Sequence, residues 1–208
     1  LGQDHGQAYA NDVARVLVVI TRQPRPERRV RELAMTSCRF LAGGQDPTGR
    51  IRNRRTVDGR WQGRFVVEDC WGRSQWAFGT AAHRSNDDIL RQMALAAYGH
   101  GVQQRSPWPR AMAFAALGAA EVLAVDPHHA PSLLLLADVA DAIGRPPTGP
   151  WPWPEARLTY ANAVLPETLL AAGGLLGEPR WVESGLRMLE WLLEVETAGE
   201  HLSVTPVG

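Results

Sequence analysis

The stretch WGRSQWAFGTAA at residues 71–82 returns in altered form as WPRAMAFAALGAA at residues 108–120. Each copy begins with a tryptophan, has an arginine two positions later and continues as an apolar segment rich in small residues. A looser third copy, WPWPEARLTYANAVLPETLLAAGG, occupies residues 151–174. The copies start 37 and then 43 residues apart, with one further helical segment between each pair. Such a period predicts stacked helical hairpins.

Apolar residues three and four positions apart predict helices along most of the chain. We expect helices at residues 8–20, 27–42, 73–84, 87–100, 109–125, 131–143, 157–175 and 179–196. Pro166 lies inside the seventh, so that helix either starts again near Leu165 or is kinked. Between the second and third helices, Asp58-Gly59 is a good two-residue turn and predicts a small β-hairpin near residues 50–67. The fold class is therefore mainly α.

The repeat predicts an inner set of helices, formed by the three copies, and an outer set that covers them. Gly79, Gly118, Gly173 and Gly174 lie on the inner set, where helices that approach closely need small residues. All inner helices would present their N-termini on one face. Four tryptophans would then gather at one rim: Trp71, Trp108, Trp151 and Trp153.

The composition excludes several classes of function. The chain of 208 residues has 22 basic and 22 acidic residues, so it lacks the net positive charge of a typical nucleic-acid binder. Every basic residue is an arginine, which excludes a Schiff base on lysine. The apolar run VLVVI at residues 16–20 is too short to span a membrane and lacks a signal-peptide cleavage pattern. With only two cysteines, Cys38 and Cys70, we expect a cytoplasmic protein.

Tryptophans at helix entrances offer flat apolar faces and indole N–H donors, which suit a sugar ring. Prolines on both sides of Trp151 and Trp153 would reduce the entropy that these residues lose on binding. The alternative is that the aromatic rings only close the end of the helical array. The expected partner is thus a carbohydrate or a sugar phosphate.

Carboxylates on the same rim could carry glycoside chemistry, which commonly uses a pair of them. Asp69 and Glu155 are the leading catalytic candidates, and Glu167 lies deeper along its helix. Their alternative role is to cap helix N-termini and compensate the helix dipole.

Further polar residues would line the pocket: Arg73, Tyr160, Asn162 and His201. Arg73 has counterparts in Arg110 and Arg157, which could bind hydroxyls or phosphate or join neighbouring hairpins. The adjacent histidines of DPHH at residues 126–129 lack the spacing of metal ligands. Cys70 has neither a partner histidine nor a motif that would make it a nucleophile. We predict neither a metal nor a cofactor, because no phosphate loop, dinucleotide fingerprint or HExxH motif occurs.

Several segments together resemble a group of actinobacterial helical-toroid proteins often labelled glycosyltransferase or glycosyltransferase-associated. These segments are DGRW, EDCWGRSQWAFGTAA, SPWPRAMAFAALGAAEVL, WPWPEARLTYANAVLPETLLAAG and EHLSVTPVG. The group is similar in architecture to six-hairpin glycosidases and N-acylglucosamine 2-epimerases. The resemblance covers the chain from about residue 27 onward and implies an (α/α) toroid with a carbohydrate pocket at the N-termini of the inner helices.

Nine residues match motif positions of this group, none of which is an assigned catalytic residue there. They are Asp69, Trp71, Arg73, Trp151, Trp153, Glu155, Tyr160, Asn162 and Glu167. The chain departs from the group in length, because eight helices make four hairpins and a closed ring needs six. We therefore expect residues 1–208 to form one domain, truncated at its C-terminus. An oligomer or the missing C-terminal segment would cover the open edge.

The sequence favours a carbohydrate-binding protein that processes glycosides in the manner of a hydrolase. The alternative is a non-catalytic sugar-binding or scaffold domain associated with a glycosyltransferase. Epimerase chemistry ranks third, because it needs histidines on the rim and only His201 is available.

Overall fold

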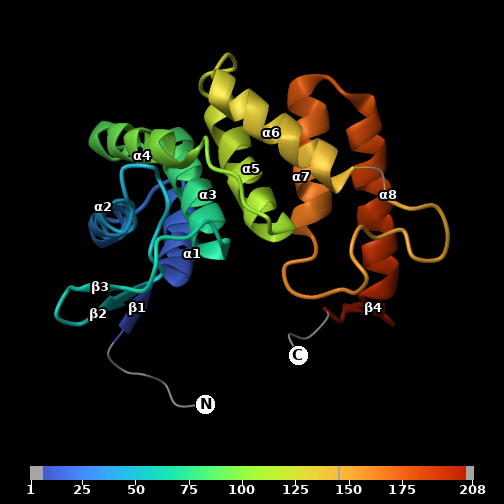
Figure 1. The fold of residues 1–208 in the computed structure, drawn as a ribbon, viewed down its shortest axis with the longest axis horizontal. Coiled ribbons are helices and arrows are strands. Elements are labelled where there is room, and N and C mark those ends of the chain that lie inside the picture. Colours follow the sequence, from blue (N-terminus) through green and yellow to red (C-terminus); the bar gives the residue numbers. More distant parts are fainter. Residues whose placement is uncertain (1–6, 145, 205–208) are drawn as a thin grey trace. The chain divides into compact units, whose positions relative to one another are not determined.

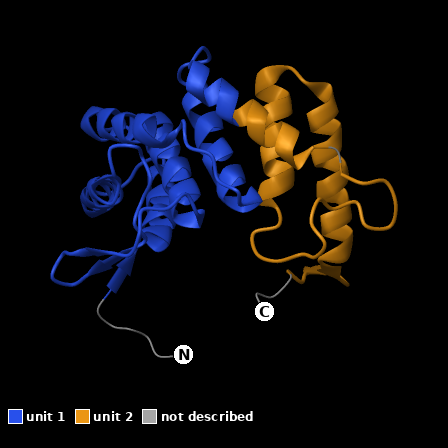
Figure 2. Cartoon of the chain, in the orientation of Figure 1, with its two compact units in different colours: residues 1–135 blue, residues 136–208 orange. Residues whose placement is uncertain are grey.

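The computed structural model describes residues 7–144 and 146–204. The chain divides into two compact units, residues 1–135 and residues 136–208, with the boundary inside a helix (Figure 2). Helices dominate both units (Figure 1), so the predicted fold class is confirmed at the level of a mainly α protein. The single domain stays a prediction.

The described residues form eight helices: α1 (Ala10–Thr21), α2 (Arg28–Gly43), α3 (Asp69–Arg84), α4 (Asp88–Gly101), α5 (Pro109–Leu123), α6 (Ala130–Ile143), α7 (Val164–Leu176) and α8 (Pro179–Val195). All eight were predicted, and most ends agree to within two residues. Two starts differ, because α3 begins at Asp69 rather than residue 73, and α7 begins at Val164 rather than residue 157. Pro166 therefore falls in the first turn of α7, where no intrahelical hydrogen bond is lost.

In unit 1 (residues 1–135), α3 lies between α1 and α5, while α2 and α4 cover this row of helices (Figure 1). The backbones of α3 and α5 touch at two levels. A Cβ atom at Gly72 would collide with the carbonyl oxygen of Ala111, and one at Gly79 with that of Gly118. Both contacts join residues 39 apart in sequence, so the two helices are parallel. The predicted close approach at Gly79 and Gly118 is confirmed.

Unit 2 (residues 136–208) packs α7 against α8. A Cβ at Gly173 would lie 2.5 Å from the Val182 side chain of α8, so this glycine also permits a close approach. The expectation for Gly174 is wrong, since nothing lies within 4 Å of a Cβ placed there. The two-layer arrangement of unit 1 agrees with stacked helical hairpins, and a toroid stays a prediction.

The predicted β-hairpin is present in unit 1. β2 (Arg54–Thr56) pairs with β3 (Trp61–Gln62), and Gly59 in the turn has a φ of 85°. β1 (Gln7–Tyr9), which the sequence did not predict, adds to β2 and completes a three-stranded antiparallel sheet. A second small hairpin, β4 (Thr197–Ala198) and β5 (His201–Leu202), follows α8.

Candidate functional site

Trp71 does not offer its ring to a ligand. It is 0% exposed, and its indole N–H donates to the carbonyl oxygen of Gly101 at 3.2 Å. The sequence repeat aligned Trp71 with Trp108, but α3 begins at Asp69, so Trp71 lies inside its first turn, whereas Trp108 precedes α5 as its N-cap residue. Trp71 therefore faces α4 in the core, and its predicted place at an exposed rim is wrong.

Trp108 is the rim tryptophan of unit 1. It is the N-cap residue of α5 and is 59% exposed. Asp69, at the N-terminus of the parallel helix α3, forms an ion pair with Arg73 at 3.5 Å. Arg73 is itself buried, with its guanidinium carbon 3.9 Å from the ring centroid of Phe114. The leading carboxylate of unit 1 is thus engaged by an arginine.

In unit 2, the proline-tryptophan segment is an irregular loop before α7. Trp153 is 1% exposed and packs on Trp191 of α8, with ring centroids 5.6 Å apart. Its predicted role as a sugar platform is wrong for the same reason as that of Trp71, because no ring face is open. Trp151 is 41% exposed, meets Trp191 edge-on at 4.9 Å and donates its indole N–H to the Glu155 carbonyl oxygen at 2.7 Å.

The other predicted residues of unit 2 are spread along the loop and both helices. Asn162 is buried and joins the loop to the end of α8, because its amide lies 3.3 Å from Glu196 and its oxygen accepts from the Thr159 N–H at 3.0 Å. Glu155 is half-buried, whereas Tyr160, Glu167 and His201 are exposed. Glu167 lies in the first turn of α7, and His201 belongs to β5. Asp69 and Glu155 lie in different units.

A cavity of about 320 Å³ lies between the proline-rich loop and α8 within unit 2. Its lining consists of Pro146, Pro147, Thr148, Gly149, Pro152, Arg187, Glu190, Trp191 and Glu194. The last four residues share one face of α8, because they are spaced three and four apart. Sequence reasoning missed this face. Its signal was a tryptophan in the otherwise polar stripe of an amphipathic helix.

The cavity combines three kinds of group that recognise polyols. The half-buried Trp191 ring supplies an apolar surface, and proline rings extend it. Toward a bound polyol, the Arg187 side chain can donate hydrogen bonds, and the Glu190 and Glu194 carboxylates can accept them. Trp153 packs behind Trp191 and fixes the orientation of its ring. Among residues 7–144 and 146–204, no three side chains of the types that bind metals gather into a metal site.

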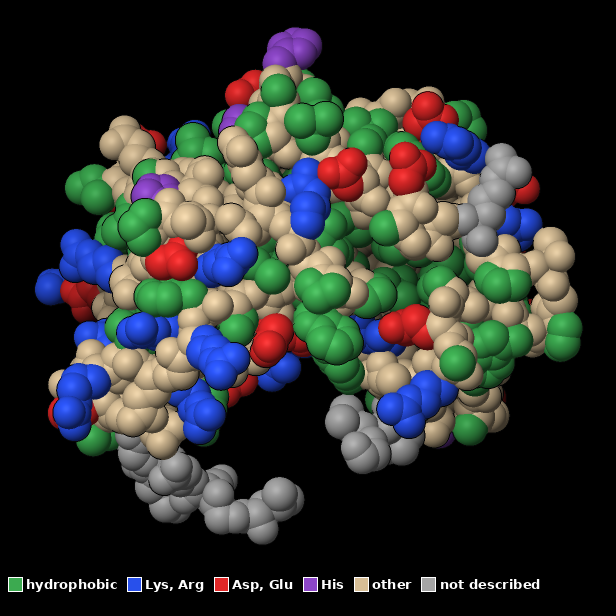
Figure 3. Space-filling model, viewed as in Figure 1, with side chains coloured by type: hydrophobic (Ala, Val, Ile, Leu, Met, Phe, Trp, Pro, Cys, Tyr) green, Lys and Arg blue, Asp and Glu red, His purple; other side chains and the backbone are tan. Residues whose placement is uncertain are grey.

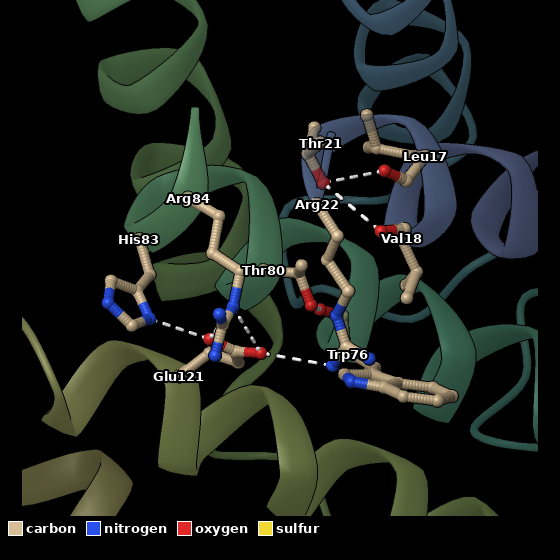
Figure 4. A network of polar contacts seen from close by, with 9 residues as sticks. All are labelled: Leu17, Val18, Thr21, Arg22, Trp76, Thr80, His83, Arg84 and Glu121. Carbon is tan, nitrogen blue, oxygen red and sulfur yellow. Dashed lines mark hydrogen bonds and ion pairs between the residues drawn. The ribbon is translucent and has the colours of Figure 1, made fainter. Parts of the chain in front are cut away.

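A second polar cluster lies at the opposite end of the α3–α5 pair, in unit 1 (Figure 4). Glu121 is only 7% exposed and accepts from Arg84 at 2.8 Å and from Arg22 at 3.1 Å. His83 Nδ1 lies 2.6 Å from the same carboxylate. Burial tends to raise the pKa of Glu121, but hydrogen bonds from His83 and Arg84, together with the charge of Arg84, lower it below its ordinary value.

This cluster joins the C-terminal ends of α1, α3 and α5, which confirms that the three helices are parallel. The sequence signal for it was one acidic residue in an otherwise apolar helix. Its carboxylate is neutralised by its basic partners, so we assign it to stability.

No family model matches the chain, and no curated protein matches it. No helix in the described part of the chain combines the length and apolarity needed to cross a membrane.

Proposed function

We propose that the protein binds a saccharide in the α8 cavity, with Trp191 as the platform for the sugar ring. The observation that carries this proposal is the half-buried Trp191 ring in a cavity that also holds an arginine and two carboxylates. A volume of about 320 Å³ accommodates one or two sugar rings. Trp151, exposed beside Trp191, extends the apolar surface.

A binding role is supported better than hydrolysis. Hydrolysis by the predicted pair, Asp69 and Glu155, would need both carboxyl groups to face one open cleft. Asp69 is instead paired with Arg73, and the most buried carboxylate of unit 1, Glu121, is held by three basic side chains. We therefore place the non-catalytic sugar-binding module first, and glycoside processing by Asp69 and Glu155 second.

Calorimetric titration with a panel of neutral oligosaccharides and sugar phosphates tests the proposal. Trp191→Ala should weaken binding by about five-fold to 150-fold, since loss of a stacked aromatic anchor commonly costs about 1–3 kcal/mol. Glu190→Gln with Glu194→Gln, both exposed and therefore compatible with folding, should weaken it several-fold. Leu193→Ala, an exposed residue outside the cavity on the same helix, is the matched control and should leave affinity unchanged.

Two results would contradict the proposal. One is that no saccharide of the panel binds, and the other is that binding survives unchanged in the Glu190, Glu194 and Trp191 variants. Turnover of a glycoside that is lost in Asp69→Asn and Glu155→Gln, with binding retained, would move the hydrolase from second place to first.

A further inference from the structure

The arginines are concentrated on the β-hairpin of unit 1. Residues 50–64 contain six arginines and a single acidic residue, Asp58, which gives this segment a net charge of +5. Figure 3 shows basic side chains gathered over the region of β1, β2 and β3. A chain without net charge thus displays a strongly positive surface.

The strand register divides these arginines between two faces of the sheet. Arg55 is paired with Trp61, and its guanidinium lies 5.7 Å from the ring centroids of both Trp61 and Phe40 of α2. This face packs on the helical body. Because side chains alternate along a strand, Arg54 lies on the opposite face, where it is exposed next to Gln62.

Arg55 is engaged by the Gly59 carbonyl oxygen and by the rings of Phe40 and Trp61. Apart from it, three arginines of the hairpin have no carboxylate partner among the described residues: Arg52, Arg54 and Arg64. In contrast, Arg60 pairs with Asp58 at 2.7 Å, and Arg50 lies close enough to Asp46 to lower the pKa of that carboxyl. Arg52 is held in place by stacking on Phe65, with 4.2 Å between the guanidinium carbon and the ring centroid. We call Arg52, Arg54 and Arg64 the arginine face. Cations that lack internal partners favour an external anion.

The groups around the arginine face restrict the kind of anion. The aromatic rings nearby, Trp61 and Phe65, are half-buried and each already lies against a guanidinium group, which makes them poor platforms for stacked bases. Three unpaired cations are also few compared with the six to ten phosphate contacts that a typical duplex-binding protein makes.

We propose that the arginine face binds an acidic oligosaccharide through carboxylate or phosphate groups on successive sugars. Guanidinium groups bind both anions in a bidentate manner. The choice of a saccharide rests on the proposed function, whereas the recognition of an anion rests on the hairpin alone. The arginine face would therefore select acidic glycans, and the α8 cavity, which carries two carboxylates, would hold a neutral sugar ring.

Fluorescence anisotropy with labelled tetragalacturonate tests this proposal, with labelled maltotetraose as the neutral counterpart. The test variant replaces all three arginines of the arginine face with Gln: Arg52→Gln, Arg54→Gln and Arg64→Gln. Its affinity for tetragalacturonate should fall at least ten-fold, and its affinity for maltotetraose should stay within two-fold. The matched control changes three ion-paired surface arginines, Arg15, Arg28 and Arg91, to Gln. It has the same net charge and should lose less than two-fold.

Competing anions separate this proposal from its alternatives. Tighter binding to a twenty-residue thymidine oligonucleotide, or to phosphatidylserine vesicles, than to tetragalacturonate would overturn it. Equal loss in the test and control variants would overturn it as well. Trp191→Ala should reduce maltotetraose binding and leave the effect of the arginine variants intact, so the two proposals can fail independently.

Discussion

Glu121 joins the C-terminal ends of three helices, α1, α3 and α5, through its basic partners. Replacing it with Gln leaves Arg22 and Arg84 without their carboxylate, although both are half exposed and remain partly solvated. We expect the free energy of unfolding to fall by about 2 kcal/mol, within the range for loss of a buried charged hydrogen-bond partner. Urea unfolding would measure this. Glu32→Gln, which breaks the exposed pair with Arg28, is the control and should change stability by no more than about 0.5 kcal/mol.

The same residue predicts a dependence of stability on pH. Because the pKa of Glu121 is lower in the folded state than its ordinary value of 4.5, its ionised form stabilises the fold at higher pH. This stabilisation is complete above pH 4.5 and is lost as pH falls through the lowered pKa. Wild type and Glu121→Gln should therefore differ most at neutral pH and converge in acid. A difference that stays constant down to pH 3 would contradict the assignment.

The two thiols are predicted to be unreactive in the folded protein. Cys38 and Cys70 are free and buried, and burial raises the pKa of each to about 12. At pH 8 the thiolate, which is the nucleophile, is then almost absent. A thiol-reactive chromogenic disulfide should label neither cysteine in the native protein and both after denaturation. Fast labelling of either one before unfolding would show that its site is open.

At the scale of single residues, the sequence predicted which residue types a saccharide site uses, but not which of these residues are exposed. Tryptophans and carboxylates do occur where a saccharide site needs them, but Trp71 and Trp153 are buried, and the platform of the cavity is Trp191. Trp71 is buried because α3 starts two residues before it and places it inside the first turn, and Trp153 is buried because its loop packs on α8. Trp191 was assigned to the last helix and went unnoticed as a ligand-binding residue.

Three glycines set the spacing of the α3–α5 pair: Gly72, Gly79 and Gly118. A methyl group at Gly118 would collide with the carbonyl oxygen of Gln75. Since backbone cannot yield as a flexible side chain can, Gly118→Ala should separate the helices and lower stability by about 2–3 kcal/mol. Gly99→Ala on α4 meets nothing within 4 Å and should instead add about 0.5–1 kcal/mol through helix propensity. Thermal unfolding would record these opposite signs, and two variants of equal stability would refute the close packing.

Elements were predictable because their signals are local. The apolar period and the Asp58-Gly59 turn both act within a few residues. β1 escaped prediction because it is three residues long and is stabilised by pairing with β2, some 47 residues away in sequence. The early start of α3 escaped for a related reason. Its first turn holds Asp69, Cys70 and Trp71, and their periodicity is clear only when their packing partners are known.

The two units carry opposite net charges, although the chain as a whole is neutral. Residues 1–135 contain 18 arginines and 12 acidic residues, a net charge of +6, while residues 136–208 contain 4 arginines and 10 acidic residues, a net charge of −6. The neutral sum therefore excludes an overall electrostatic attraction to polyanions, but it does not describe either unit. The arginine face lies in the positive unit and the two carboxylates of the α8 cavity lie in the negative one.

This separation of charge predicts unusual behaviour on ion exchangers. A protein with an isoelectric point near 7.2 and evenly mixed charges passes through both resin types at that pH. Here, at about 20 mM salt, where screening is weak over the width of a unit, the protein should be retained on both sulfonate and quaternary-amine columns. Retention on sulfonate should drop more in the combined Arg52, Arg54 and Arg64 variant than in the control that removes Arg15, Arg28 and Arg91, although the net charges are equal. Passage of the wild type through both columns would show that the opposite charges do not form separate surfaces.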